Sequence, residues 1–461
     1  MAEALCESEY IGGVGGQTMH LIGVDIGTTS ICGVLMNGTD GSIVRSVTKP
    51  NDAGLSTDRD WEKLQDPAKI IATVEEIVDH LAGLKEDVGG IGISGQMHGM
   101  LYVDRDGNHV SPLYTWQDQR GNLPCPDFSQ PRNSDSRAAS YAAVLSGMTG
   151  YALSTGFGVV THYYNARNGL VPGTAATLCT IGDYAAMKLA GSRTPMTDVT
   201  NAAALGLFRM DTLEFDERAL REVGLAREML PAVVPSGTVA GYWQGRVPVF
   251  SALGDNQASV LGSVGPIGDS LLVNIGTGAQ ISVFSREYRE IAGLETRPFP
   301  GGGYILVGAP LSGGKSYALL ENFFRQVCRQ FAAFDGPELY DRMNDLAAEF
   351  MEARGGLIRS VGASAAHDAE SADRPIVHTQ FYGTRENPGR RGSIERISPD
   401  NFTPEALIVA FLEGIAGELH HFYGLIPEDL KQKLRVMVGA GNGIRRNKAL
   451  KRVLEYTFGF P

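Results

Sequence analysis

Two short segments, one in each half of the chain, combine glycine with hydroxyl side chains directly after an apolar run. The first is Gly27-Thr28-Thr29, which follows Asp25, and the second is Gly276-Thr277-Gly278, which follows Leu271 to Asn274. Glycine lets a ligand approach the backbone closely, and successive amides can bind the oxygens of a phosphate. One such turn is most often a plain turn. Two of them, in corresponding places, indicate that the phosphates of one nucleotide are held from two sides.

Two carboxylates stand at the ends of apolar runs. Asp25 ends the first run and could hold a hydrated Mg²⁺ ion. Asp255 follows the predicted strand Val247 to Ala252, within Gly254-Asp255-Asn256. A carboxylate there would face a cleft between the halves and could accept the proton of a sugar hydroxyl during phosphoryl transfer. From spacing alone, a Gly-Asp turn without chemistry is an equally good interpretation.

A polyol needs several directional hydrogen bonds and an apolar surface for its carbon skeleton. Two segments offer such groups: Gly95-Gln96-Met97-His98-Gly99 and Thr115-Trp116-Gln117-Asp118. Taken singly, His98 is better explained as a structural histidine and Trp116 as a core residue. Taken together, the amide, imidazole, indole and carboxylate groups favour a sugar site.

Two further glycine-rich segments precede predicted helices. Gly439 to Gly443 stands before a helix over Asn447 to Tyr456 and would let a flat base or a phosphate approach the backbone. Gly313-Gly314-Lys315-Ser316 resembles the end of a P-loop, but it lacks the earlier glycine of that motif. We therefore interpret it as a helix start beside the nucleotide.

The elements around these residues predict an α/β fold. Met19 to Met36 reads as a β-hairpin, Asp66-Pro67 as the start of a helix, and Gly89 to Ser94 as a buried strand. The second half repeats the strand–Gly-Thr–strand unit, which predicts two similar domains around a cleft. We expect a flexible leader over 1–19, an N-terminal domain over 20–245 and a C-terminal domain over 246–461.

Later elements follow the same logic. Residues 354–374, rich in Gly, Ala, Ser and charge, predict an exposed connection. Thr403-Pro404 predicts another capped helix, and Val436 to Val438 predicts a strand that enters the turn at Gly439.

Composition narrows the class of protein. The 461 residues carry a formal charge of −12 and show no large basic cluster, which argues against a nucleic-acid partner. The five cysteines form no CxxC pair, a pattern typical of free thiols in a reducing compartment. We find no signal-peptide profile and no apolar stretch of about 18 residues. The prediction is a cytoplasmic protein without a membrane partner; the oligomeric state stays open, a homodimer included.

The ordered set of motifs resembles the FGGY carbohydrate kinases. The resemblance runs from about residue 20 to the end and rests on six segments: 23–30, 94–99, 116–118, 254–256, 274–278 and 439–443. Ser154 to Gly158 and Thr197 to Ala203 resemble the members that act on sedoheptulose, whereas the xylulose kinases share the Gln-Met-His segment. Family members usually continue beyond residue 461, so we expect a C-terminal domain that is truncated.

The resemblance implies two ribonuclease-H-like, actin-like ATPase domains with a central cleft for sugar and MgATP. Asp255 matches the catalytic base and Asp25 the carboxylate near Mg²⁺. The other matched positions divide into phosphate loops, sugar site and adenosine region: Gly27, Thr28, Thr29, Gly276, Thr277 and Gly278; Gln96, Met97, His98, Trp116 and Asp118; Gly441, Asn442 and Asn447.

The expected reaction is ATP-dependent phosphorylation of a ketose at its terminal primary hydroxyl, at O7 if the sugar is sedoheptulose. A kinase for another ketose or polyol, chiefly xylulose, is the first alternative. A non-catalytic nucleotide-binding sugar sensor is the second, and the presence of Asp255 argues against it because a sensor needs no base.

Overall fold

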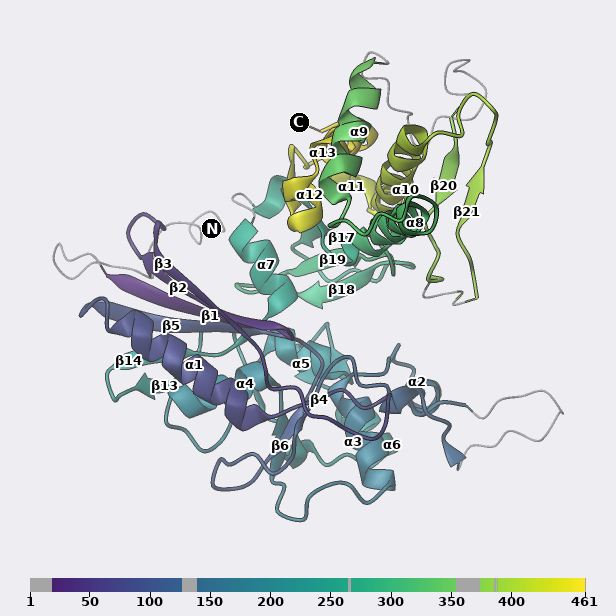
Figure 1. The fold of residues 1–461 in the computed structure, drawn as a ribbon. Helices are drawn as coiled ribbons and strands as arrows, with labels where there is room; N and C mark the ends of the chain where they lie inside the picture. The colour runs from purple at the N-terminus through teal and green to yellow at the C-terminus, as the bar shows by residue number, and fades with distance from the viewer. Residues whose placement is uncertain are drawn as a thin grey trace. The chain divides into compact units, whose positions relative to one another are not determined.

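The computed structural model describes residues 19–126, 139–263, 267–353, 374–384, 387 and 389–460. The chain divides into two compact units, drawn in Figure 1: unit 1 is Met1–Ala258 with Pro298–Gly301, and unit 2 is Ser259–Arg297 with Gly302–Pro461. The predicted leader lies outside the described residues except for Met19. The predicted connection over 354–374 also lies outside them except for Arg374, which is buried and pairs with Glu413 at 3.1 Å.

Unit 1 is built on a mixed sheet with the strand order β13-β14-β5-β1-β2-β3, and β15 also pairs with β5. The predicted hairpin is confirmed: β1 pairs antiparallel with β2, and β2 with β3. β5 pairs parallel with β1 on its other side. The strands are β1 (His20–Ile26), β2 (Ser30–Asn37), β3 (Ile43–Pro50), β5 (Val88–Gly95), β13 (Val239–Trp243), β14 (Val247–Phe250) and β15 (Leu253–Gly254).

The boundary predicted at 245/246 differs from the division into units. Residues 246–258, which the sequence analysis assigned to the second domain, lie with unit 1. The reason is strand pairing, since β14 and β15 both add to the sheet through β5.

Helices α1 (Pro67–Ala82) and α4 (Ile181–Leu189) lie side by side on one face of this sheet (Figure 1). The Asp66 carboxylate caps α1 by accepting the Ala68 amide at 2.9 Å, as the Asp-Pro pair predicted. A Cβ on Gly33 of β2 would lie 2.2 Å from the Ile77 side chain, so the glycine lets α1 pack directly on the strand.

A second apolar core in unit 1 gathers smaller elements around Tyr102, Leu145, Val160 and Leu205. Its helices are α2 (Tyr141–Thr149), α3 (Gly158–Arg167), α5 (Val199–Leu205) and α6 (Glu217–Val223). The short strands of unit 1 are β4 (Leu64–Gln65), β6 (Leu101–Val103), β7 (Leu113–Tyr114), β8 (Thr177–Cys179), β9 (Met196–Asp198), β10 (Phe208–Arg209), β11 (Glu214–Phe215) and β12 (Ala232–Val234).

Unit 2 has a five-stranded sheet in the order β18-β19-β17-β16-β22. Its strands are β16 (Ser270–Ile275), β17 (Ala279–Ser285), β18 (Glu295–Pro298), β19 (Tyr304–Gly308) and β22 (Val436–Ala440), with the small pair β20 (Ile376–His378) and β21 (Ser393–Glu395) beside it. The helices are α7 (Asp255–Ser263), which begins in unit 1, α8 (Gly314–Ala332), α9 (Tyr340–Ala353), α10 (Pro404–Leu425), α11 (Glu428–Lys431), α12 (Asn442–Arg446) and α13 (Lys448–Phe458). The capped helix predicted at Thr403-Pro404 is confirmed as α10.

The two sheets share one pattern of pairing. In unit 1 the hairpin β1–β2 extends to β3 on one side and has β5 parallel to β1 on the other. In unit 2 the hairpin β16–β17 extends to β19, and β22 lies parallel to β16. The topology therefore confirms the internal duplication that the two Gly-Thr turns indicated. Among the described residues, no helix is both long and apolar enough to cross a membrane.

Candidate active site

The pairing in unit 1 brings the two predicted carboxylates to one edge of the sheet. Asp25 on β1 is in register with Ser94 on β5, and Ser94 is in register with Leu253 on β15. Asp255 follows β15 directly, so both carboxylates stand at the carboxyl ends of parallel strands. Two strand spacings correspond to about 10 Å. Both aspartates are exposed.

Asp25 is a candidate ligand for Mg²⁺. Its Oδ1 atom accepts a hydrogen bond from the Ser94 hydroxyl at 2.6 Å, which orients the carboxylate. The side chain is exposed and lies on the strand that enters the Gly27-Thr28-Thr29 turn. An oriented, accessible carboxylate beside hydroxyl groups is a suitable donor set for a hydrated magnesium ion.

The first Gly-Thr turn is held from beneath by polar side chains. Asn51 donates to the Gly27 carbonyl at 2.8 Å, and Gln65 donates to the Thr28 carbonyl at 2.9 Å. The Gly27 amide donates to the Ser30 carbonyl at 3.0 Å, which closes the turn. The turn carbonyls therefore point into the protein, whereas Thr29 is exposed.

A chain of hydrogen bonds joins this turn to the predicted sugar residues. Buried Gln96 donates to Gln65 at 2.9 Å and accepts from the Thr28 hydroxyl at 3.4 Å. Trp116 is exposed, and its indole Nε1 donates to Thr28 Oγ1 at 3.0 Å. The interpretation of Trp116 as a core residue is therefore wrong, because its ring lies on the surface beside the turn. Gln96 is therefore connected to the Trp116 indole by two hydrogen bonds that share the Thr28 hydroxyl.

Met97 and His98 follow β5 at the same sheet edge. Met97 is buried, and its sulfur lies against Gly254, the residue before Asp255. His98 has a φ of 71°, its Nδ1 donates to the Ala204 carbonyl at 2.8 Å, and its ring stacks on Phe157 at 4.5 Å between centroids. These contacts fix the orientation of the imidazole.

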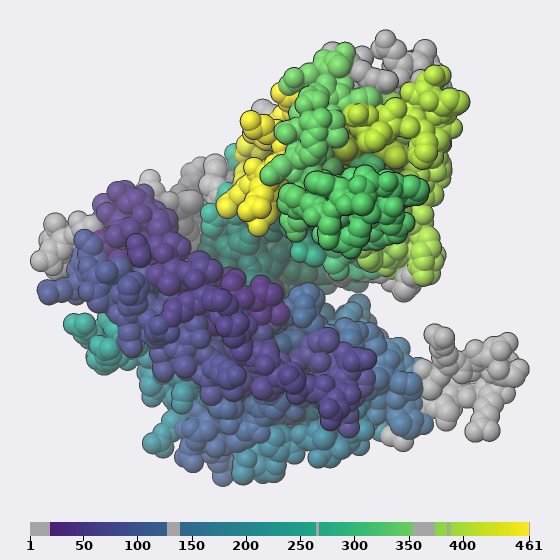
Figure 2. Space-filling view, in the orientation of Figure 1, coloured from purple at the N-terminus to yellow at the C-terminus, as the bar shows by residue number. Residues whose placement is uncertain are grey.

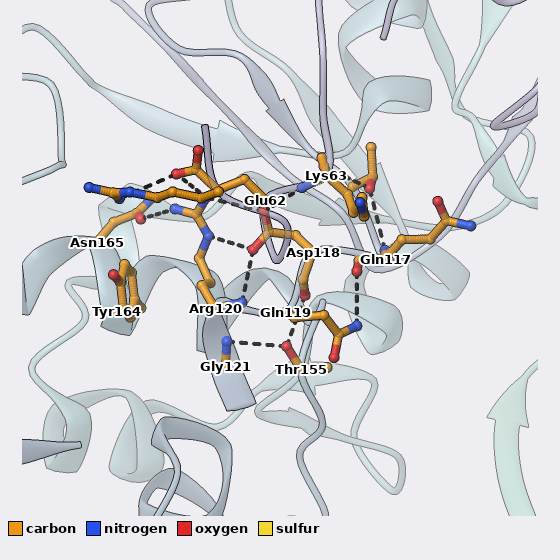
Figure 3. Close-up of polar contacts among 12 residues, drawn as sticks. Glu62, Lys63, Gln117, Asp118, Gln119, Arg120, Gly121, Thr155, Tyr164 and Asn165 are labelled. Carbon is orange, nitrogen blue, oxygen red and sulfur yellow. Dashed lines mark hydrogen bonds and ion pairs between the residues drawn. The ribbon is translucent and has the colours of Figure 1, made fainter. Parts of the chain in front are cut away.

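Asp118 is paired with Arg120, as Figure 3 shows. The side chain is 0% exposed, and Arg120 binds both carboxylate oxygens, through Nε at 2.7 Å and through a terminal nitrogen at 3.2 Å. The Lys63 amide donates to it as well at 3.0 Å. With its oxygens engaged inside the protein, Asp118 holds the loop that carries Trp116, and this geometry does not favour direct contact with a sugar.

The cation that pairs with Asp118 is itself enclosed. Arg120 donates to Asn165 at 2.5 Å, and its guanidinium lies 4.2 Å from the ring centre of Tyr114. Aromatic faces stabilise a buried guanidinium, so the ion pair is satisfied without solvent.

Two more buried carboxylates lie near the strand that leads to Asp255. Burial raises the pKa of Asp183 to about 7, against an ordinary value of 3.8. Burial also raises the pKa of Asp198. Each belongs to a helix start: Asp183 forms a capping box with Thr180 on α4, and Asp198 caps α5.

Unit 2 gathers the second Gly-Thr turn with both glycine-rich segments. Gly276, Thr277 and Gly278 are exposed, and the Thr277 carbonyl accepts the Lys315 amide at 2.9 Å. A Cβ on Gly314 would lie 2.1 Å from the Gly276 carbonyl, so α8 can start against the turn only because glycine stands there. The predicted helix start at Gly313 is thus confirmed. In Figure 2, α8 lies at the surface of unit 2.

The glycine turn after β22 lies at the same edge of the second sheet. Asn274 on β16 is in register with Ala440 on β22. Gly441 has a φ of 87°, and a Cβ added to it would lie 2.4 Å from the Ile275 carbonyl oxygen. Asn442 is exposed at the start of α12. Asn447 instead is buried and caps α13 by accepting the Leu450 amide at 2.8 Å, so its side chain has a structural task.

Local sequence patterns do not reveal which residues support the site. Asn51 and Gln65 stand in segments without a motif, so no local signal pointed to them. Ser94 and Thr200 lie inside the segments 94–99 and 197–203, which resemble family motifs. Their hydrogen-bond partners, Asp25 and Gly254, come from strands distant in the sequence.

The fold, two carboxylates at one sheet edge and two Gly-Thr turns agree with the features expected of a carbohydrate kinase. Residues 20–262 match the model of the FGGY family of carbohydrate kinases, N-terminal domain, and the chain belongs to that family. It is a sugar kinase. The predicted fold of two ribonuclease-H-like, actin-like domains is confirmed by its likeness to solved xylulose and glycerol kinases.

Among particular proteins, the chain is similar to mouse sedoheptulokinase, with 27% identity over 95% of this chain and 93% of that protein. The fold is similar to that of a ligand-bound xylulose kinase from Lactobacillus acidophilus, with a TM-score of 0.74, 19% identity, and coverage of 96% of this chain and 85% of the other. Plasmodium falciparum glycerol kinase with ADP has a TM-score of 0.75, 19% identity and the same two coverages.

Proposed function

We propose that this sugar kinase transfers the γ-phosphoryl group of MgATP to the terminal primary hydroxyl of a ketose, with sedoheptulose as the preferred substrate and sedoheptulose 7-phosphate as the product. The observation that carries the proposal is the register of β1, β5 and β15, which brings Asp25 and Asp255 to one sheet edge. The similarity to mouse sedoheptulokinase over nearly the whole chain supports the choice of sugar.

Each residue then has a chemical task. Asp255 accepts the proton of the sugar hydroxyl while the hydroxyl oxygen attacks the γ-phosphorus and the bond between that phosphorus and ADP breaks. The proton later passes from Asp255 to solvent. His98 and Trp116 bind the sugar through an imidazole and an indole face, and buried Met97 packs against Gly254. Gln96 acts through Thr28, to which it is hydrogen-bonded.

Each unit, taken by itself, carries residues that we assign to the nucleotide. In unit 1, Asp25 would hold the magnesium ion of MgATP, Thr28 and Thr29 would bind phosphate oxygens, and Gly27 would let the phosphate approach the turn. The bound ion supplies positive charge to the transferring group. In unit 2, Gly276 to Gly278 would bind phosphate, and Gly441 with Asn442 would lie against the adenosine. Asn447 would support that surface as the cap of α13.

The test is ADP release from wild type with sedoheptulose, xylulose, gluconate and glycerol, alongside Asp255→Asn. We expect the highest kcat/KM with sedoheptulose. The Asn variant should lose about 10³-fold in kcat, because an amide cannot accept the proton, while calorimetry still detects sugar binding. A preference for xylulose would replace our choice of sugar, and a fully active Asp255→Asn would refute the base. The cytoplasmic location stays a prediction, and the oligomeric state stays open.

A further inference from the structure

One helical turn of unit 1 holds the backbone that leads into Asp255. Helix α5 begins after its cap, Asp198, and its first turn carries Thr200 and Asn201. The Asn201 amide donates to the Ala252 carbonyl at 2.9 Å, and the Gly254 amide donates to the Thr200 hydroxyl at 2.9 Å. The two hydrogen bonds hold the backbone at Ala252 and at Gly254, on either side of Leu253 and immediately before Asp255.

The direction of the Thr200 hydroxyl is fixed. Asp198 Oδ1 accepts both the Thr200 amide at 2.8 Å and the Thr200 hydroxyl at 2.7 Å. Since the hydroxyl proton points to Asp198, a lone pair of the same oxygen is left to accept the Gly254 amide. All three polar groups are buried, so water cannot replace either bond.

The opposite side of Gly254 is also constrained. Gly254 pairs with Gly95 on β5, and a Cβ added to it would lie 2.8 Å from the sulfur of Met97. The sheet, Met97 and α5 therefore surround the residue that precedes Asp255. A change in any of these supports would move the start of α7, whose first residue is Asp255.

We propose that Thr200 and Asn201 are positioning residues for phosphoryl transfer: they fix the Ala252–Gly254 backbone so that the Asp255 carboxylate keeps its place relative to Asp25. The inference rests on the proposed function, in which Asp255 is the base. Neither residue touches the substrates in this assignment, so they should act on the chemical step and leave binding unchanged. A displacement of about 1 Å at a reacting group can lower a rate about 100-fold.

The decisive comparison is Thr200→Val against Thr200→Ser. Valine keeps the shape and removes the acceptor of the Gly254 amide, whereas serine keeps the hydroxyl. We expect Thr200→Val to lower kcat about 10- to 100-fold with the KM values for sugar and MgATP within about twofold of wild type. Thr200→Ser should restore most of the activity.

Thr161→Val serves as a matched control. Thr161 is another buried threonine of unit 1, on α3, and its hydroxyl has no hydrogen-bond partner among the described residues. This variant should keep the wild-type kcat. Thermal melting of all the variants separates a loss of folding from a loss of positioning.

If Thr200→Val does not fold, Asn201→Ala takes its place with the same expected split between kcat and KM, because it removes the bond to Ala252. If Thr200→Val or Asn201→Ala folds and keeps the wild-type kcat, the inference is overturned. The proposed function still stands in that case, provided that the wild-type enzyme turns over the sugar. Wild type without sugar-dependent ADP release would overturn both.

Discussion

The indole Nε1 of Trp116 donates a hydrogen bond to Oγ1 of Thr28 at 3.0 Å. One residue was predicted to face the sugar and the other to bind phosphate. Thr28 also donates to Gln96, so the three side chains form one connected group. A sugar that contacts the Trp116 indole would therefore also affect the orientation of Thr28 in the phosphate turn.

This connection predicts non-additive effects of substitution. Trp116→Phe keeps an aromatic face but removes the N–H donor, and Thr28→Val removes its acceptor. Trp116→Phe should lower kcat/KM by about fivefold, since one hydrogen bond contributes about 1 kcal/mol. Thr28→Val should lower it further, because the Thr28 hydroxyl also donates to Gln96 and is assigned to the phosphates. The double variant should be little worse than Thr28→Val alone. Initial rates over a grid of sugar and MgATP concentrations measure this, and strictly multiplicative losses would show that the bond does not couple the two residues.

Asp25→Asn should raise the magnesium concentration that gives half-maximal activity by at least about tenfold, because a neutral amide is a poorer ligand for a hard cation. Ser94→Ala removes only the hydroxyl that orients Asp25 and should raise it by no more than about fivefold. Titration of ADP release with Mg²⁺ at fixed ATP distinguishes the two. An unchanged magnesium dependence in Asp25→Asn would remove the ion from this carboxylate.

Gly156→Ala should weaken sugar binding through the Trp116 loop. Gly156 has a φ of 85°, and an added Cβ would lie 2.1 Å from the Trp116 carbonyl. We expect the sugar KM to rise about tenfold, with a loss of stability of about 1–3 kcal/mol. Gly150→Ala is the control: its φ is 76°, but nothing lies within 4 Å, so it should lose about 1 kcal/mol of stability with an unchanged KM. Equal KM values in the two variants would contradict this account.

Asp183 should make the stability of the enzyme depend on pH near neutrality. Its pKa is about 7 in the folded protein because of burial, against 3.8 ordinarily, so the folded state binds the proton more tightly than the unfolded state. The resulting stabilisation is complete below pH 3.8 and is lost as the pH rises to about 7. Between pH 5.5 and 7 the loss should be about 2 kcal/mol.

Urea unfolding of wild type and Asp183→Asn at several pH values tests this expectation. As the pH rises, the free energy of unfolding of the wild type should fall relative to that of Asp183→Asn, because asparagine does not titrate. Asp198 and Cys179 lie close enough to interact electrostatically with Asp183, so each can shift the midpoint. Asp40→Asn, at an exposed turn, should run parallel to wild type above pH 5. Parallel curves for Asp183→Asn as well would contradict the raised pKa.

Local patterns in the sequence determined the elements and the strand ends. Asp66-Pro67 and Thr403-Pro404 marked helix starts because capping involves residues a few positions apart. The two Gly-Thr turns revealed the duplicated hairpin for the same reason. Asp25 and Asp255 could be chosen because each follows an apolar run that had to be a strand.

Only the tertiary structure decided what each side chain at those positions contacts. Asp118 is enclosed by Arg120, Arg120 by Asn165, and Trp116 finds its partner in Thr28. Asn447 serves as a helix cap, and Gly254 depends on Thr200 from another helix. Most of these contacts join residues far apart in the chain, which no spacing rule reaches. Local chemistry therefore determined which groups were available, and long-range packing decided which of them face solvent and a substrate.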